Sequence, residues 1–160
     1  MTQAYRPLPD AQLLWDTFSY NPLTGQLYRK DGKPAGHTAL NRYIGVSVGN
    51  CQYYAHRVIW KWCHGTDPAA MVDHINGVRA ANQIWNLRQC DMVQNAANAT
   101  KHRDNASGYK GVYLRKDRIR PRWVAKLGNR RIGTFDTPEE AHAAYCAKAT
   151  ELHGHFHRAA

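Results

Sequence analysis

Asp73 and His74 stand side by side in a polar stretch, and their side chains are of the types that can cut a phosphodiester bond. A carboxylate binds hard divalent cations, and an imidazole, with an ordinary pKa of about 6.5, can take a proton from water near neutral pH. Asn95 follows in the same segment and offers an amide oxygen as a second hard ligand. The residue types therefore predict a metal-assisted hydrolytic site.

The elements predicted around this pair are a strand, a turn, a second strand and a helix. The first strand covers the apolar start at residues 71–74, and Asn-Gly at 76–77 is a turn signal. The second strand runs through residues 84–87, and Asp91 is an N-cap signal for the helix that follows. In this arrangement the pair ends the first strand, Asn95 projects from the first turns of the helix, and the three side chains converge.

The motif Asp-His-Ile-Asn-Gly that begins at Asp73, with Asn-Leu-Arg beginning at Asn86 and then Asn95, resembles the HNH nuclease motif, a ββα-metal fold, of phage and intron-encoded homing endonucleases. The resemblance implies that Asp73 and Asn95 hold one Mg²⁺ or Mn²⁺ ion. It implies that His74 is the general base that takes a proton from the attacking water, and that Asn86 braces the loop carrying His74. The implied activity is metal-dependent cleavage of double-stranded DNA by a homing endonuclease or nickase.

Residues around this motif extend the comparison and also depart from it. The segment 55–60 resembles the short helix that precedes the motif in this subfamily. Two interpretations of His56 in that helix stay open: it approaches a phosphate or supports the catalytic site, or it caps the helix. Ala81 stands where the family usually has an acidic residue, and Trp85 stands where it usually has a polar one. These two departures support the alternative of a DNA-binding regulator with impaired catalysis.

The positive charge of the chain is concentrated in one segment. The sequence has 22 lysines and arginines against 12 acidic residues, a net charge of +10 with histidines neutral. Residues 101–131 hold eleven of the basic and two of the acidic residues, so the remainder is nearly neutral. A charge concentrated in this way predicts a module that binds a polyanion, and a structured RNA remains an alternative to duplex DNA.

The basic segment also predicts a small sheet followed by a helix. Strands are expected at residues 111–114, 122–127 and 130–135, with a tight turn at Gly128-Asn129. The capping-box sequence that begins at Thr137 starts a helix whose apolar positions recur at helical spacing. Strict alternation along the middle strand predicts one core face (Trp123, Ala125, Leu127) and one cationic face (Arg122, Val124, Lys126).

This sheet and helix resemble the DNA-binding domain of plant ethylene-response factors, the apetala type. The match lies in Ser-Gly-Tyr-Lys-Gly-Val-Tyr at 107–113, Arg-Trp-Val-Ala at 122–125 and Ile-Gly-Thr-Phe-Asp-Thr at 132–137. Such domains lay their sheet in the major groove. The resemblance implies that Trp123 and Phe135 are core residues. It implies DNA contacts by Lys110, Tyr113, Arg115, Arg122, Lys126 and Arg131.

The N-terminal third is predicted to be rich in β-structure. A short helix is expected at residues 10–17, followed by hairpins within residues 18–28 and 43–54. The cations of this region that are candidates for phosphate contacts are Arg29, Lys30, Lys33 and Arg42.

An α+β fold with two domains is therefore expected. Residues 1–100 form the nuclease domain, with a β-rich part at 1–54 and a ββα-metal core at about 55–100. Residues 101–108 form a basic linker, and residues 109–160 form the second DNA-binding domain.

The remaining expectations concern cofactors, partners and location. The four cysteines contain no Cys-x-x-Cys pair, so no zinc is expected. No apolar run approaches the roughly 20 residues of a membrane span, and no secretory signal pattern opens the chain. We expect no membrane association, no protein partner, a monomer on double-stranded DNA, and a cytoplasmic location in a phage-infected bacterium.

Overall fold

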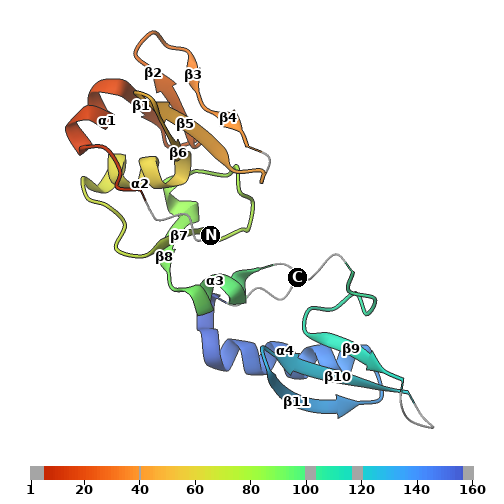
Figure 1. Cartoon of the computed structure of the whole chain (residues 1–160). Helices are drawn as coiled ribbons and strands as arrows, with labels where there is room; N and C mark the ends of the chain where they lie inside the picture. Colours follow the sequence, from red (N-terminus) through yellow and green to blue (C-terminus); the bar gives the residue numbers. More distant parts are fainter. Residues whose placement is uncertain (1–5, 40, 100–103, 117–120, 157–160) are drawn as a thin grey trace. The chain divides into compact units, whose positions relative to one another are not determined.

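The computed structural model of the 160-residue chain describes residues 6–39, 41–99, 104–116 and 121–156. The chain divides into two compact units, Met1–Asp91 (unit 1) and Met92–Ala160 (unit 2). Each unit combines helices with antiparallel strands (Figure 1), so the α+β class expected from the sequence is confirmed.

Unit 1 begins with a short helix that leads into a hairpin. The side chain of Asp10 caps helix α1 (Ala11–Thr17) by accepting a backbone hydrogen bond of 2.8 Å from its first turn. Strands β1 (Phe18–Asn21) and β2 (Gln26–Arg29) then pair antiparallel, and β3 (Pro34–Ala35) pairs with β2. The predicted helix and the first predicted hairpin are both confirmed.

A second three-stranded sheet and a helix complete the frame of unit 1. The sheet consists of β4 (His37–Thr38), β5 (Ile44–Val48) and β6 (Cys51–Tyr54), with β5 in the middle. Helix α2 (Ala55–His64) follows β6 directly and ends at Gly65, whose φ of 73° closes the last turn in the left-handed conformation that glycine adopts at low cost. The second N-terminal hairpin and the helix before the motif are confirmed.

The predicted catalytic stretch forms a two-stranded ribbon. Strand β7 (Met71–His74) pairs antiparallel with β8 (Leu87–Cys90). The second strand thus begins at Leu87, and the prediction that it starts at Ile84 was wrong. Residues Ile84–Asn86 instead form the short 3₁₀ turn η1, because the backbone N–H of Asn86 bonds to the carbonyl oxygen of Gln83 at 2.8 Å.

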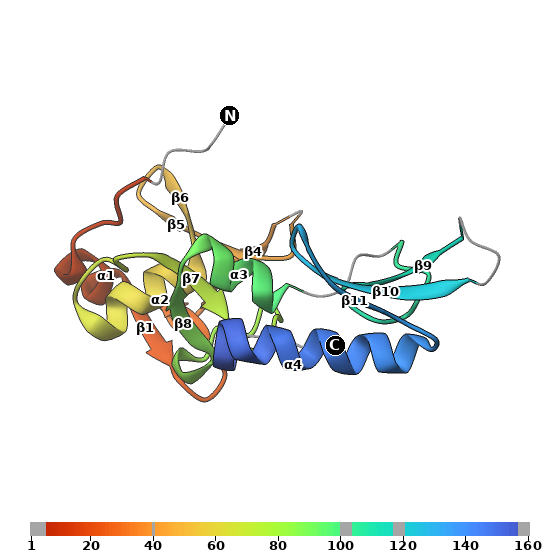
Figure 2. The ribbon, with the colours of Figure 1, turned by 90° about the horizontal axis from the view of Figure 1, so that it is seen from below.

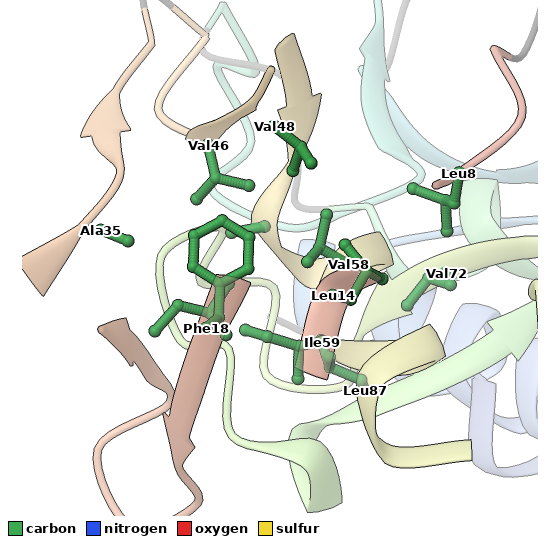
Figure 3. Close-up of a cluster of buried hydrophobic side chains, with 12 residues drawn as sticks. Leu8, Leu14, Phe18, Ala35, Val46, Val48, Val58, Ile59, Val72 and Leu87 are labelled. Carbon is green, nitrogen blue, oxygen red and sulfur yellow. The ribbon is translucent and has the colours of Figure 1, made fainter. Parts of the chain in front are cut away.

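Apolar side chains from both halves of unit 1 form one core. Figure 3 shows Phe18 and Leu14 from the first helix and hairpin facing Val46 of β5 and Ile59 of α2. These four side chains are at most 1% exposed. Burial of apolar side chains contributes about 1.5–3 kcal/mol each, so this core fixes the N-terminal sheets against the helix that leads to the ribbon.

Unit 2 is a helix packed on a three-stranded sheet, with one short helix before it. Its elements are α3 (Met92–Asn98), β9 (Val112–Arg115), β10 (Arg122–Leu127), β11 (Arg130–Phe135) and α4 (Pro138–His153). Strand β10 lies in the middle of the sheet, and α4 runs along one face of it (Figure 2). The predicted sheet, its Gly-Asn turn and the helix are confirmed.

The ends of α4 follow their sequence signals. The hydroxyl of Thr137 accepts from the N–H of Glu140 at 3.2 Å, and the carboxylate of Glu140 accepts from the N–H of Thr137 at 3.3 Å, which completes a capping box. At the other end Gly154 closes the helix and opens the short turn η2 (Gly154–Phe156).

A β-bulge in unit 2 changes which side chains share a face of the sheet. Ala125 pairs with Gly133, but its neighbour Lys126 pairs with Arg131, so Ile132 has no partner across the ladder. Ile132 packs against the core beneath α4. The extra residue therefore places Arg131 directly opposite Lys126.

The face opposite α4 is not wholly cationic. Trp123 and Phe135 pack against the core beneath α4, as expected. Val124, which alternation assigns to the cationic face, is nevertheless fully buried, and it pairs with Tyr113 on one side and Thr134 on the other. An apolar centre thus interrupts the charged surface that strict alternation predicts.

Candidate active site

Asp73 and His74 occupy the last two positions of β7, and their side chains point to opposite faces of the ribbon. The register pairs Asp73 with Arg88 and His74 with Leu87. Since side chains alternate along a strand, His74 shares the buried face with Val72, and Asp73 shares the other face with Arg88. Two adjacent residues are thereby placed in two different environments.

The carboxylate of Asp73 is held by the guanidinium of Arg88. Oδ2 of Asp73 accepts from Nη2 at 3.2 Å and from Nε at 3.3 Å. The two side chains are only 10% and 12% exposed, so solvent screens this ion pair weakly. Arg88 lies within the Asn-Leu-Arg motif, but the sequence alone assigns it no role. The antiparallel register of the two strands, which places it opposite Asp73, is the signal that reveals it.

His74 is buried and makes a hydrogen bond to an asparagine. Its side chain is 2% exposed, and its Nε2 lies 2.8 Å from Oδ1 of Asn82, which is also 2% exposed. Burial lowers the pKa of His74, and the Asn82 hydrogen bond and the charge of Asp73 only partly offset this effect. The imidazole is therefore neutral near pH 7, the form that can accept a proton.

His56 lies beside His74 inside unit 1. The N-cap of α2 is Tyr54, and His56 is the second residue of the helix proper. Its ring stands edge-on to the ring of His74, with centroids 5.2 Å apart, and is stacked on the ring of Tyr54 at 5.5 Å. Burial, followed by the effects of His74 and Arg57, lowers the pKa of His56 to about 3. Among the described residues, its buried Nδ1 has no hydrogen-bond partner.

Asn86 closes the loop that follows His74. Its Oδ1 accepts from the N–H of Asn76 at 3.1 Å, and its Nδ2 donates to Oδ1 of Asn76 at 3.0 Å and to the carbonyl oxygen of Ala81 at 2.7 Å. The contact to position 81 uses the backbone, and Trp85 is 60% exposed. The two departures from the family pattern therefore leave the hydrogen bonds of Asn86 intact.

The predicted metal ligands do not lie in the same unit. Asp73 belongs to unit 1, whereas Asn95 is an exposed residue of α3 in unit 2. Within the described residues, no group of three or more His, Cys, Asp or Glu side chains is arranged to hold a metal ion. The fixed carboxylate of Asp73 nevertheless has the donor chemistry that a hard divalent cation requires.

The predicted DNA contacts of unit 2 fall into two groups. Tyr113, Lys126 and Arg131 are exposed, and Nη2 of Arg131 donates to Oγ1 of Thr134. Arg115 is half-buried at the end of β9.

The other two predicted DNA contacts are engaged within unit 2. Nζ of Lys110 donates to the carbonyl oxygen of Ala97 at 2.6 Å. Nε of Arg122 lies 3.3 Å from the carbonyl oxygen of Phe135 and 3.1 Å from Oδ1 of Asp136. Both cations thus have partners in the protein that a phosphate would have to replace or share.

The sequence also indicated candidate phosphate contacts in the N-terminal third, unpaired cysteines and no membrane-spanning segment. Arg29, Lys30, Lys33 and Arg42 are exposed, and Lys33 forms an ion pair of 3.3 Å with Asp31. The thiols of Cys51, Cys63, Cys90 and Cys146 are all free. In the part of the chain that the structure describes, no helix has both the length and the apolar character needed to cross a membrane.

Comparison with known proteins identifies the ribbon and its flanking helices. Residues 53–97 match the family model of the HNH endonucleases, whose members act on DNA with a divalent metal ion. The searches of curated proteins and of solved structures found no match. The match covers the pair at the end of β7, its bracing asparagine and Asn95. Residues 53–97 therefore form an HNH endonuclease domain, which implies a nuclease that acts on phosphodiester bonds.

Proposed function

We propose that the protein is a site-specific DNA endonuclease of the homing or nicking type, in which the HNH segment cuts the duplex and the sheet of unit 2 binds it. The observation that carries the proposal is the pair at the end of β7. One residue is a neutral, buried histidine and the other is a carboxylate fixed by an ion pair. The resemblance to phage and intron-encoded enzymes supports the homing role and a phage-infected bacterium as its setting.

His74 is the proposed general base. Because Oδ1 of Asn82 can only accept a hydrogen bond, Nε2 of His74 carries the proton and Nδ1 carries the lone pair. Nδ1 takes a proton from a water molecule as its oxygen attacks phosphorus. The bond from phosphorus to the 3′ oxygen breaks, the departing oxygen takes a proton from solvent water, and the products are a 5′ phosphate and a 3′ hydroxyl.

Asp73 is the proposed metal ligand in unit 1. Arg88 binds one carboxylate oxygen and fixes the orientation of the group, and ordering a ligand before the metal arrives favours binding. The resemblance to the HNH motif assigns Asn95 as the second ligand. A bound Mg²⁺ or Mn²⁺ ion would supply stabilisation of the charge that develops on the phosphate and on the departing oxygen.

Asn86 is proposed to hold the loop after His74 in its shape. Its three side-chain hydrogen bonds join the two ends of the loop, so that the backbone following the catalytic pair cannot move independently. His56 is proposed to support the ring of His74 by contact, because the two rings lie edge to face within the same buried cluster.

The sheet of unit 2 is the proposed grip on double-stranded DNA. Lys126 and Arg131 lie opposite each other across the bulge, and Tyr113 is exposed on β9. The resemblance to apetala-type domains supports an approach through the major groove, with Arg115 among the residues that meet the bases. Lys110 and Arg122 are proposed as phosphate contacts. Each would bind a phosphate in addition to its partner within the protein, the carbonyl oxygen of Ala97 for Lys110 and the carboxylate of Asp136 for Arg122.

A second candidate is a DNA-binding regulator with impaired cleavage. The observation that favours it is the 2% exposure of His74, since a base must reach the water that it activates. The two candidates differ in whether the protein cuts DNA at all.

Mapping of DNA ends distinguishes the two candidates. Phage and bacterial genomic DNA would be incubated with the protein and Mg²⁺, or Mn²⁺ in a parallel sample, and all new termini sequenced. The nuclease proposal predicts recurrent termini that carry a 5′ phosphate and need the metal ion. If neither ion yields new termini while the protein still binds DNA, the nuclease proposal is wrong and the DNA-binding regulator is the supported function.

A further inference from the structure

The turn between β1 and β2 of the N-terminal hairpin contacts the backbone of the loop that follows His74. Gly25 lies in this turn with a φ of +73°, and a Cβ atom at its position would lie 2.6 Å from the carbonyl carbon of Asn82 and 2.6 Å from the backbone nitrogen of Gln83. Such distances are too short for any side chain. Only glycine therefore allows the hairpin to approach the loop this closely.

The neighbouring strand binds the same segment through a tyrosine. The hydroxyl of Tyr20 in β1 donates to the carbonyl oxygen of Asn82 at 3.0 Å and accepts from the N–H of Ile84 at 2.9 Å. Burial raises the pKa of Tyr20 to about 12, so the hydroxyl stays protonated and able to donate. The side chain of Gln83 adds a bond of 3.3 Å to the carbonyl oxygen of Thr24.

The residue held in this way is the hydrogen-bond partner of His74. Its backbone is fixed by Tyr20 on one side and by the turn at Gly25 on the other, and its side chain is buried with Oδ1 2.8 Å from Nε2 of His74. A continuous set of contacts thus runs from the N-terminal hairpin through Asn82 to the imidazole.

We propose that Tyr20, Gly25 and Asn82 are positioning residues for cleavage: the hairpin fixes Asn82, and Asn82 fixes the ring of His74. The inference rests on the proposed role of His74 as the base. It gives the N-terminal hairpin a catalytic purpose that its sequence does not reveal. Displacement of a catalytic group by about 1 Å can lower a rate by about a hundredfold, so a small shift of this segment is enough to slow cutting.

Matched variants separate this role from general support of the fold. Tyr20→Phe removes one hydroxyl and keeps the ring, and Tyr28→Phe is its control, because the Tyr28 hydroxyl has no hydrogen bond in the described part of the chain. Gly25→Ala introduces the clash, and Gly32→Ala is its control, since Gly32 has a similar φ of +80° but open space around it.

The measurement is the single-turnover cleavage rate of a DNA fragment that carries an end-mapped site. The fragment is held at a fixed Mg²⁺ concentration, below the unfolding temperature of every variant. We expect Tyr20→Phe and Gly25→Ala to lower the rate at saturating protein by roughly tenfold or more. The protein concentration at half-maximal rate stays unchanged, and the two control variants cut at the wild-type rate.

A double-mutant cycle tests the route through Asn82. If Tyr20 acts on His74 through Asn82, then Asn82→Ala slows cleavage and adding Tyr20→Phe causes no further loss. Equal rates for wild type, Tyr20→Phe and Gly25→Ala, or fully multiplicative losses in the double variant, overturn the inference. A wild-type protein that cuts no faster than His74→Ala overturns the proposed function itself, which is a different outcome.

Discussion

Two nitrogen atoms of Arg88 bind the same carboxylate oxygen, Oδ2 of Asp73, at 3.2 and 3.3 Å. The ion pair is nearly buried and joins the two strands of the ribbon directly beside the buried histidine. The metal-ligand role proposed for Asp73 therefore depends on the guanidinium of Arg88, which is itself part of the HNH segment.

Loss of Arg88 should destabilise the protein. Arg88→Met removes the guanidinium that pairs with the buried carboxylate of Asp73. Breaking a buried ion pair from one side costs about 3–5 kcal/mol. Urea denaturation would measure the change in the free energy of unfolding. Lys33→Met is the matched control, because the exposed Lys33–Asp31 pair should contribute less than about 1 kcal/mol. Equal effects of the two substitutions would show that Arg88 does not stabilise the site.

The stability of unit 1 should fall in mildly acidic solution. The folded-state pKa of His56 is about 3, below its ordinary value of 6.5, so between these values the unfolded chain binds a proton that the folded protein does not. The free energy of unfolding therefore decreases as the pH drops below about 6.5, by up to about 1.4 kcal/mol per pH unit for this residue. His74, whose pKa is also lowered, acts in the same direction.

Urea midpoints at about pH 7.5 and about pH 5.5, above the range in which most carboxylates titrate, test this prediction. His56→Phe keeps a ring in the buried cluster and removes the titrating group. The variant should lose less stability over this interval than the wild type. The same loss in both proteins would mean that His56 is protonated in the folded state.

Asn86 should be needed both for stability and for cutting. Asn86→Ala removes three hydrogen bonds that join the two ends of the loop, at a cost of about 2 kcal/mol or more. Denaturation and cleavage assays would report the two effects. Asn50→Ala, in an exposed turn, should change neither one. A variant at Asn86 that unfolds more easily but cuts at the wild-type rate would remove the bracing role.

Lys126 and Arg131 should contribute to DNA affinity through charge. Each alanine variant should weaken binding to all duplexes and lower the slope of log affinity against log salt by about 0.9, the expected effect of one phosphate contact. Lys148→Ala, on α4, is the control and should leave the slope unchanged. Structured RNA should compete less well than duplex DNA at the same salt concentration; the opposite order would favour the RNA-binding alternative.

Arg115 should affect discrimination between DNA sequences. If it reads a guanine through two hydrogen bonds, Arg115→Ala lowers the preference for the mapped site over altered sites by about 1–3 kcal/mol. A binding assay with single-base variants of the site would measure this loss. A uniform loss of affinity across all variants would instead make Arg115 a phosphate contact.

Local sequence signals predicted most of the helices and strands, but they could not predict contacts between residues that are distant in the sequence. The capping box at Thr137 and the turn at Gly128-Asn129 depend on neighbours in the chain, and both appear as expected. The pairing of Asn82 with Tyr20 joins residues 62 positions apart, and neither propensity nor periodicity encodes such a contact. The hydroxyl of Tyr20 also accepts from the N–H of Ile84, a contact that spans 64 positions of the sequence.

The alternation of side chains along a strand could not predict the bulge in β11 either. Alternation along β11 without an extra residue would put Arg131 on the same face as Phe135, toward the core. The unpaired Ile132 turns to the core instead and leaves Arg131 beside Lys126. Predicting it would have required the register of the pair as well as the sequence of one strand.

The most direct test of the central claim is the cleavage rate of His74→Ala and Asp73→Ala compared with wild type, on an end-mapped DNA fragment with Mg²⁺ and with binding measured in parallel. The proposed mechanism predicts that loss of the base lowers the rate by about 10²–10⁴-fold and that loss of the carboxylate abolishes cutting. Both variants should retain wild-type affinity for the fragment when metal is absent. Cleavage by His74→Ala at the wild-type rate would contradict the assignment of His74 as the base.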